Sequence, residues 1–170
     1  IQETEGLDLV AINDPYIDPE YMAYMLDHDP THGKFRGSVE ADPAGLLIDG
    51  RPIAVTTHKN PAEINWIAAG ARFVVEASGH FDTAKKAAAH FKGGAQRVVV
   101  AAPCGEVPQF IMGANHLSYR NEPLISAGSA ATHCLALLAR AVHEAAGIAQ
   151  GCVSVLHASR PHELEHIAAG

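Results

Sequence analysis

Histidine and glutamate residues near the C-terminal end of the sequence form the pattern HELEH at positions 162–166. On a helix, the first and last residues of an HExxH pattern share one face, where two imidazoles can bind zinc beside a glutamate that activates water. This chemistry would make the protein a metallohydrolase. A catalytic zinc site usually has a third protein ligand, however, and only four residues follow His166. The charged Glu165 also departs from the usual form of the pattern. We therefore expect a solvated helix or tail and no metal site.

Cysteine chemistry is limited to three residues, Cys104, Cys134 and Cys152. Their number is odd and no two of them have CxxC spacing, which disfavours both a disulfide framework and a thiolate zinc site.

The overall composition is that of a globular domain. A chain of 170 residues fits one ordinary domain, and its 48% hydrophobic and 18% charged residues exclude wholesale disorder. The formal net charge of -7 disfavours a general nucleic-acid or anionic-membrane partner. No apolar run approaches the roughly 18–20 residues that span a bilayer, and the N-terminal residues lack the features of a signal peptide. We expect a soluble cytoplasmic protein.

Two segments of the N-terminal half have strand patterns. An apolar run covers residues 7–12 and stops at Asn-Asp-Pro, residues 13–15, where turn-forming residues and a proline end a strand. Segment 46–56 has two β-rich halves around an Asp-Gly pair at 49–50, and such a pair readily adopts the positive φ of a tight turn. The sequence predicts a buried strand and then an antiparallel hairpin.

A strand-helix-strand unit is predicted in the middle of the chain. Residues 72–77 and 97–102 are nearly continuous apolar runs, which are typical of parallel strands covered on both faces. Between them, four apolar residues recur at helical spacing: Ala84, Ala87, Ala88 and Phe91. Asp82 is a candidate cap for this helix and Gly93 a candidate stop. The crossover should be right-handed.

The C-terminal part continues the alternation of strands and helices. A short strand is predicted at 124–127, then a helix with one apolar stripe of four residues: Leu135, Leu138, Ala139 and Val142. Ser129 is a plausible N-cap, and Gly147 ends the helix. Residues 152–156 are predicted to form a last strand. This order of elements favours an α/β doubly wound sheet.

Five segments, in the same order along the chain, resemble glyceraldehyde-3-phosphate dehydrogenase. They are VAINDPYID (10–18), DPTHGKFRG (29–37), EASGHF (76–81), FIMGANH (110–116) and SAGSAATHCLALLAR (126–140). The family has a nicotinamide dinucleotide-binding domain and a catalytic domain, in which a cysteine thiolate attacks an aldehyde and hydride passes to NAD. The resemblance implies a partial NAD(P)-binding Rossmann-like domain over 1–128. It also implies a nucleophile-helix region with the beginning of the catalytic domain over 129–170.

The resemblance implies NAD contacts at six residues: Asn13, Asp14, Lys59, Ser78, Gly79 and Ala101. An acid such as Asp14 at a strand end can accept hydrogen bonds from the adenosine ribose diol, although a simple turn residue would fit the same position. Lys59 stands where the family usually has an arginine near the adenine, so the charge is kept and the planar guanidinium is lost. Ala101 replaces a serine on the nicotinamide side.

The family's nucleophile motif, S-C-T-T-N-C, corresponds here to S-A-A-T-H-C at 129–134. The nucleophile position is Ala130, whose methyl group cannot form a thiohemiacetal. Cys134 aligns with the second cysteine of the motif, about 6 Å further along a helix, where we expect a small core residue and no substitute nucleophile.

Other active-site positions are only partly kept. His157 matches the family's catalytic base, and Ser129 keeps one contact to the substrate phosphate. Ala131 lacks the neighbouring hydroxyl, and Arg160 replaces an expected threonine. The resemblance therefore predicts a degenerate chain that oxidises no aldehyde on its own.

The family's opening strand and its glycine-rich phosphate turn would precede Ile1, and its later phosphate-binding threonine and arginine would lie beyond Gly170, so the resemblance suggests truncation at both ends. Because that strand is central in the order 3-2-1-4-5-6, we expect strand 7–12 to be displaced from the strand-helix-strand unit, and NAD binding to be weak. The main alternative is a non-catalytic interaction protein that associates with intact relatives or with itself through uncovered sheet edges. Another alternative is an enzyme that recovers its missing parts from a partner chain.

Overall fold

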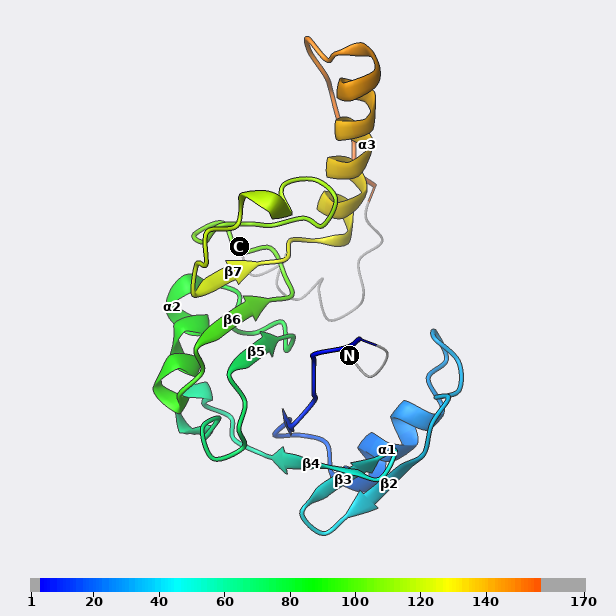
Figure 1. The fold of residues 1–170 in the computed structure, drawn as a ribbon, viewed down its shortest axis with the longest axis vertical. Helices are drawn as coiled ribbons and strands as arrows, with labels where there is room; N and C mark the ends of the chain where they lie inside the picture. Colours follow the sequence, from blue (N-terminus) through cyan, green and yellow to red (C-terminus); the bar gives the residue numbers. More distant parts are fainter. Residues whose placement is uncertain (1–3, 157–170) are drawn as a thin grey trace.

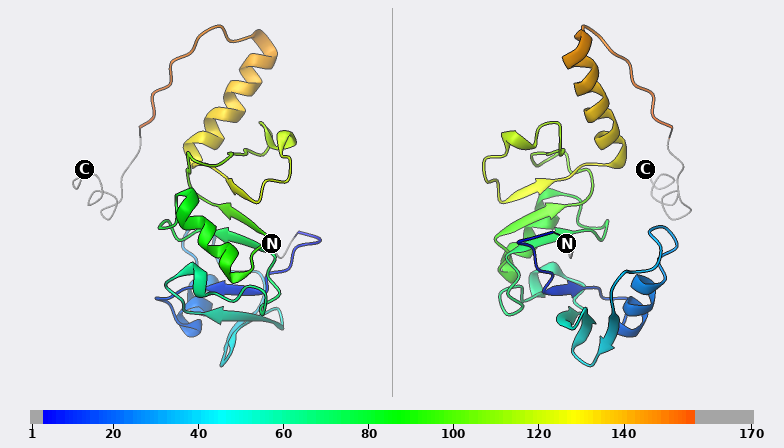
Figure 2. Two further views of the ribbon diagram at one scale, coloured as in Figure 1. Left: turned by 90° about the vertical axis from the view of Figure 1, so that its left-hand side faces the viewer. Right: turned by 45° about the vertical axis from the view of Figure 1, so that its right-hand side comes forward.

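The computed structural model describes residues 4–156, which form two sheets with helices against them (Figures 1 and 2). The α-helices and strands, in chain order, are β1 (Ala11–Asn13), α1 (Pro19–Asp27), β2 (Val39–Asp42), β3 (Gly45–Ile48), β4 (Arg51–Thr56), β5 (Phe73–Glu76), α2 (Ala84–Ala87), β6 (Arg97–Val100), β7 (Leu124–Ser126) and α3 (Ala130–Ala146). Three 3-10 helices complete them: η1 (Pro61–Glu63), η2 (Ala88–Gly93) and η3 (His116–Ser118). The predicted α/β class is confirmed.

The first sheet is mixed and has the order β1-β4-β3-β2. Strand β1 runs parallel to β4, and β3 runs antiparallel to both β2 and β4. The predicted hairpin is confirmed, because Ile48 pairs with Arg51 across the Asp-Gly turn, whose residues 49 and 50 have φ values of 50° and 74°. Two positive φ values are what a type I′ turn requires. The core of this sheet contains Leu46, Ile48 and Ile53.

The second sheet is parallel and has the order β5-β6-β7. Between β5 and β6 the chain forms α2, which continues directly into η2, so the predicted strand-helix-strand unit is confirmed. Its core joins the two strands to the helix and to the loop after η1; among its members are Ile64, Trp66, Val74, Ala87, Val98 and Val100. This core shares no buried residue with the core of the first sheet, although Ala11 of β1 packs against it.

Details of the middle unit differ from the prediction. The cap of α2 is Thr83, whose hydroxyl accepts from the Lys86 amide, whereas Asp82 pairs with the Lys86 ammonium on the surface. The helix ends one residue later than predicted, because the left-handed cap is Gly94, with φ of 94°. Strand β5 is covered on one face only, since the side chains of Phe73 and Val75 are 63% and 60% exposed.

The N-terminal strand lies in a different sheet from the strand-helix-strand unit, as predicted. Only residues 11 and 12 of the predicted strand 7–12 are in β1, which continues to Asn13, because only residues 11–13 are in register with residues 54–56 of β4. Within residues 4–156, β4 is the only strand paired with β1, and β6 is the only strand paired with β5. Each sheet thus has an uncovered edge at one of these two strands.

Helix α3 extends away from the sheets (Figure 2), with the predicted cap at Ser129 and the predicted end at Gly147. No residue of α3 is buried, and its apolar stripe is open to solvent: Leu138 is 60% exposed. The predicted strand at 152–156 is wrong, because this segment has no regular structure and no neighbouring strand among the residues described. No helix within residues 4–156 is long and apolar enough to cross a membrane.

Candidate functional site

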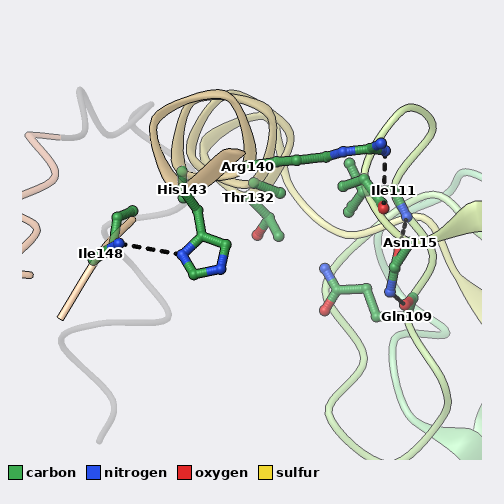
Figure 3. Close-up of a pocket in the computed structure, with 10 residues that line it drawn as sticks. Gln109, Ile111, Asn115, Thr132, Arg140, His143 and Ile148 are labelled. Atoms are coloured by element: carbon green, nitrogen blue, oxygen red, sulfur yellow. Dashed lines mark hydrogen bonds between the residues drawn. The ribbon is translucent and has the colours of Figure 1, made fainter. Parts of the chain in front are cut away.

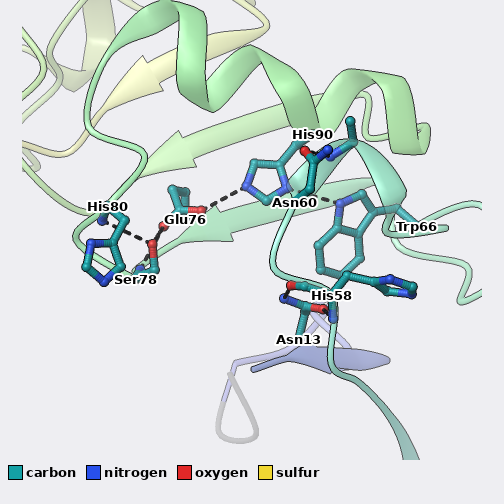
Figure 4. Close-up of polar contacts among 9 residues, drawn as sticks. Asn13, His58, Asn60, Trp66, Glu76, Ser78, His80 and His90 are labelled. Atoms are coloured by element: carbon teal, nitrogen blue, oxygen red, sulfur yellow. Dashed lines mark hydrogen bonds and ion pairs between the residues drawn. The ribbon is translucent and has the colours of Figure 1, made fainter. Parts of the chain in front are cut away.

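The carboxyl end of β1 is joined to the segment after β4 by Asn13 (Figure 4). Its side-chain oxygen accepts from the Thr56 hydroxyl at 2.9 Å and from the His58 amide at 3.0 Å. Its side-chain NH₂ donates to the His58 carbonyl oxygen at 3.0 Å. Asn13 therefore fixes the two strand ends relative to each other, and its amide oxygen has two donors already.

Asp14 follows directly and lies half-buried at the same strand end. One oxygen of its carboxylate accepts from the Tyr16 amide at 2.8 Å, which leaves the second oxygen for a ligand. The ammonium of Lys59 lies 5.6 Å from the centre of the Tyr16 ring. The structure thus brings together three of the predicted cofactor residues, Asn13, Asp14 and Lys59, with Tyr16 between the latter two.

The other three predicted cofactor residues lie at the carboxyl ends of β5 and β6. Ser78 and Gly79 form the turn after β5, in which Gly79 has φ of 76°, and Ala101 follows β6. The Ala101 amide donates to the Glu76 carbonyl oxygen at 2.9 Å, which ties the two ends together. All three residues are exposed. Carboxyl ends of parallel strands are where open α/β sheets bind ligands.

A buried series of hydrogen bonds that the sequence did not reveal leads from this turn into the core (Figure 4). The Trp66 indole N–H donates to His90 Nδ1 at 3.2 Å, and His90 Nε2 lies 2.8 Å from a Glu76 oxygen. The other Glu76 oxygen accepts from the Ser78 amide at 2.7 Å and from its hydroxyl at 2.5 Å. The one signal in the sequence is an acidic residue at the end of an otherwise apolar strand.

Burial alone would raise the pKa of Glu76, but hydrogen bonds from His90 and Ser78 outweigh burial and hold that pKa below its ordinary value of 4.5. The carboxylate is therefore the form that the fold prefers. Since the pKa is lower in the folded than in the unfolded chain, Glu76 stabilises the fold above pH 4.5, and this contribution is lost as the pH falls through the folded-state value.

We expect the unfolding free energy of the wild-type chain to exceed that of a Glu76→Gln variant most clearly near pH 7. The difference should shrink below pH 4.5, as the wild-type carboxyl takes up its proton. Urea unfolding at several pH values measures this difference. Glu40→Gln, at an exposed position of β2, is the matched control and should show no such trend. A difference that is constant from pH 7 to pH 3 would contradict the prediction.

The first turn of α3 contains the residues that the resemblance places at the nucleophile. The Ser129 hydroxyl accepts from the Thr132 amide at 3.1 Å, so this hydroxyl caps the helix. Ala130 is the first residue of the helix and is exposed, and its side chain is a methyl group. Cys134 follows one turn later and is exposed, which corrects the prediction that it is a core residue. Position 130 therefore has no thiol.

A groove runs between α3 and the loop before β7 (Figure 3). Polar side chains along it bond to the chain itself: Arg140 donates to the carbonyl oxygens of Gly113 and Ala114, and Asn115 accepts from the Ile111 amide at 2.7 Å. His143 Nδ1 accepts from the Ile148 amide at 3.2 Å. These hydrogen bonds hold the loop against α3, and the side chains that make them are not arranged as a catalytic site.

Several predicted residues lie outside the described part of the chain: His157, Arg160 and the HELEH segment at 162–166. Within residues 4–156, no group of three or more His, Cys, Asp or Glu side chains could hold a metal ion.

The described residues fit one half of a dinucleotide. The free Asp14 oxygen suits a ribose diol, and the Lys59–Tyr16 pair borders that position. A pyrophosphate needs backbone N–H groups at a glycine-rich turn or a helix N-terminus. The Asp18 carboxylate caps α1 and repels phosphate, α2 has only four residues, and at the N-terminus of α3 the Thr132 amide already donates to Ser129. Across residues 4–156 we find no glycine-rich turn that leads from a strand into a helix.

The comparisons with known proteins all indicate the same family. Residues 1–84 match the family model described as "Glyceraldehyde 3-phosphate dehydrogenase, NAD binding domain". The chain is 47% identical over 156 residues to a glyceraldehyde-3-phosphate dehydrogenase of Danio rerio, which covers 91% of this chain and 47% of the relative. It is 47% identical over 152 residues to a cytosolic one of Chondrus crispus, covering 89% and 45%. It is 45% identical over 157 residues to a chloroplastic one of Arabidopsis thaliana, covering 91% and 37%. The chain spans about half the length or less of these curated relatives.

Proposed function

Because the chain belongs to the glyceraldehyde-3-phosphate dehydrogenase family, whose NAD-binding domain it matches, we propose that its strand ends form the adenosine side of an NAD site. The fold is a partial Rossmann-like NAD-binding domain of the oxidoreductase lineage, and NAD is the cofactor that the family implies. When bound, NAD accepts a hydride. We propose a cytoplasmic location, as in the cytosolic relative and unlike the chloroplastic one, where glycolytic aldehyde oxidation would take place.

One observation supports the placement of the nucleotide. Asp14 has a carboxylate oxygen that no backbone donor uses, at the same strand end as Lys59. Asn13 fixes this corner through its three hydrogen bonds to Thr56 and His58. We propose that Asp14 binds the ribose hydroxyls, that Lys59 lies at the adenine, and that Ser78, Gly79 and Ala101 face the rest of the cofactor.

We also propose that the chain is inactive as a thiol-dependent dehydrogenase. Its support is the methyl group of Ala130 at the start of α3, where the family's motif has the nucleophilic cysteine. The Ser129 hydroxyl is left as the part of the motif that could contact a substrate phosphate, and we propose His157 as the remaining base.

Calorimetric titration with NAD tests the nucleotide site. We expect weak, saturable binding with a Kd near or above about 1 mM, because few phosphate donors offset the cost of ordering the ligand. Asp14→Ala should remove the heat of binding, whereas Glu20→Ala, an exposed acid on α1, should leave it unchanged. Two results would contradict the proposal: micromolar binding that survives Asp14→Ala, or no binding at any NAD concentration.

A second candidate function is association without catalysis, either with intact relatives or with another copy. It is supported by the uncovered edges of β1 and β5, which offer unpaired backbone groups to an added strand. Such association needs no nucleophile at Ala130.

We expect analytical ultracentrifugation to show species larger than the monomer at tens of micromolar chain, roughly the concentration range of weak contacts. Val75→Lys should shift this equilibrium toward the monomer, because a lysine beside the β5 edge opposes strand pairing. Val142→Lys places the same charge on an exposed position of α3 and serves as the control. A monomer at every concentration would exclude association between copies.

A further inference from the structure

The hydrogen bonds that join Trp66, His90 and Glu76 have a fixed donor-to-acceptor direction. An indole N–H can only donate, so His90 Nδ1 is the acceptor and the ring proton is on Nε2. His90 Nε2 must then donate to Glu76, which as a carboxylate only accepts. Ser78 donates to the same carboxylate from the other side, and the Ser78 hydroxyl oxygen accepts from the His80 amide at 3.2 Å. The two buried bonds thus run outward from Trp66 to Glu76, whereas the bonds from Ser78 and His80 run inward from the turn.

This series of hydrogen bonds connects the core to the exposed turn at Ser78 and Gly79. Trp66, His90 and Glu76 are 6%, 4% and 6% exposed, whereas Ser78 and Gly79 are exposed. A Cβ added at Gly79 would meet no atom within 4 Å, so no side chain packs against the tip of the turn. Next to the turn, the His80 carbonyl oxygen accepts from the exposed Lys86, and the Phe81 ring lies edge-on to His90. The buried carboxylate is the hydrogen-bonding partner that joins Ser78 itself to the core.

We propose that Glu76 and His90 are positioning residues for the Ser78–Gly79 turn, and that Trp66 sets the direction of the hydrogen bonds through which they act. A carboxylate at this depth is costly to bury, and an apolar side chain would fill the same space. Both of its oxygens are used, one toward the core and one toward the turn. That this turn contacts a ligand rests on the NAD site proposed above.

The fixed direction predicts a specific conflict in Glu76→Gln. A glutamine has an oxygen at only one of the two positions that the Glu76 oxygens occupy and an NH₂ at the other. It therefore cannot accept from His90 on one side and from Ser78 on the other. Reversing the His90 tautomer would bring its Nδ1–H against the Trp66 N–H and leave a buried donor unpaired. The Ser78 amide is exposed and can bond to water. We expect the conflict to be resolved at the turn, where the Ser78 hydrogen bond is lost.

Replacing Trp66 by Phe should ease this conflict, because a proton on His90 Nδ1 then lacks an acceptor but no longer faces an indole N–H, so one unpaired donor remains in place of two opposed ones. In the double variant Trp66→Phe/Glu76→Gln, His90 Nε2 can accept from the glutamine NH₂, and the glutamine oxygen can again accept from Ser78. A role in packing alone would make the two substitutions additive or worse. Recovery of the turn in the double variant is the distinguishing signature.

The test is NMR on the full 170-residue chain, with amide exchange at Ser78 and His80 measured against the Val99 amide of β6 as a reference for global stability. We expect exchange at the turn to be at least about tenfold faster in Glu76→Gln and to return toward the wild-type rate in the double variant. Trp66→Phe alone should leave the turn unchanged. The ¹⁵N signals of His90 should show the Nε2–H form in the wild type and the Nδ1–H form in the double variant.

The proposal is overturned if the turn in Glu76→Gln exchanges as in the wild type, or if the double variant shows no recovery. Titration of the same variants with NAD separates this proposal from the proposed function. If the turn responds as expected and NAD affinity does not change, the positioning role stands and the placement of the turn in the cofactor site is wrong.

Discussion

Incubated with glyceraldehyde 3-phosphate, phosphate and NAD, the chain is expected to form no NADH above a protein-free blank. Hydride transfer in this family requires a thiohemiacetal, and the first residue of α3 is Ala130, which has no thiol. Loss of a catalytic nucleophile typically lowers kcat by about 10⁴-fold to 10⁶-fold. The nearest cysteine in the motif, Cys134, is one helical turn away, and misplacement by about 1 Å can already cost a hundredfold in rate.

Absorbance at the NADH band measures this result, and two variants interpret it. Ala130→Cys restores the thiol and should still fall short of normal turnover, because the described residues hold no pyrophosphate cradle. Cys134→Ser should have no effect. A robust rise in NADH that scales with the concentration of homogeneous chain would overturn the prediction, and its loss in Cys134→Ser would identify the substitute nucleophile.

Gly93→Ala is expected to destabilise the β5-β6-β7 unit by about 3 kcal/mol, near the upper end of the usual cost of overpacking. The end of η2 lies against the backbone of the loop that carries Trp66, and the Trp66 amide donates to the Gly93 carbonyl oxygen at 2.9 Å. A Cβ at Gly93 would lie 2.0 Å from the Ile64 carbonyl oxygen. The backbone must move to admit the methyl group.

Thermal and urea unfolding measure this change. The control is Gly105→Ala, because a Cβ there meets no atom within 4 Å and Gly105 has no positive φ. This control should shift the unfolding free energy by no more than about 0.5 kcal/mol. Equal midpoints for the two variants would show that the contact at Gly93 is not tight.

The elements that the sequence predicted correctly have local signals. The Asp-Gly turn at 49–50 needs only its own φ preferences, and the cap at Ser129 needs only the next turn of helix. The helix α1 and the strand β2 were missed. Strand β2 alternates apolar and charged residues over only four positions, which is too short to stand out, and α1 has apolar residues on most sides, so its core-facing stripe is not distinct. The Asp-Pro pair at 18–19, an N-cap followed by a proline, was the available signal for α1.

The candidate site was predictable where it depended on strand ends, and not where it depended on tertiary hydrogen bonds. Asp14 and Ser78 follow apolar runs, and the family motifs identify both positions. The chain of Trp66, His90 and Glu76 joins residues that are 24 and 14 positions apart in the sequence. The three residues lie on different elements, Trp66 in the loop after η1, Glu76 on β5 and His90 on η2, so only the packed structure brings these side chains together.

The two separate cores affect how unfolding can be observed. The chain has one tryptophan, Trp66, and it belongs to the core of β5, β6 and η2. The other core, around Leu46, contains no tryptophan. Intrinsic tryptophan fluorescence therefore reports on the parallel sheet alone, whereas far-UV circular dichroism sums over both sheets. If the sheets melt independently, the two methods will give different midpoints, and a single two-state free energy will not describe the chain.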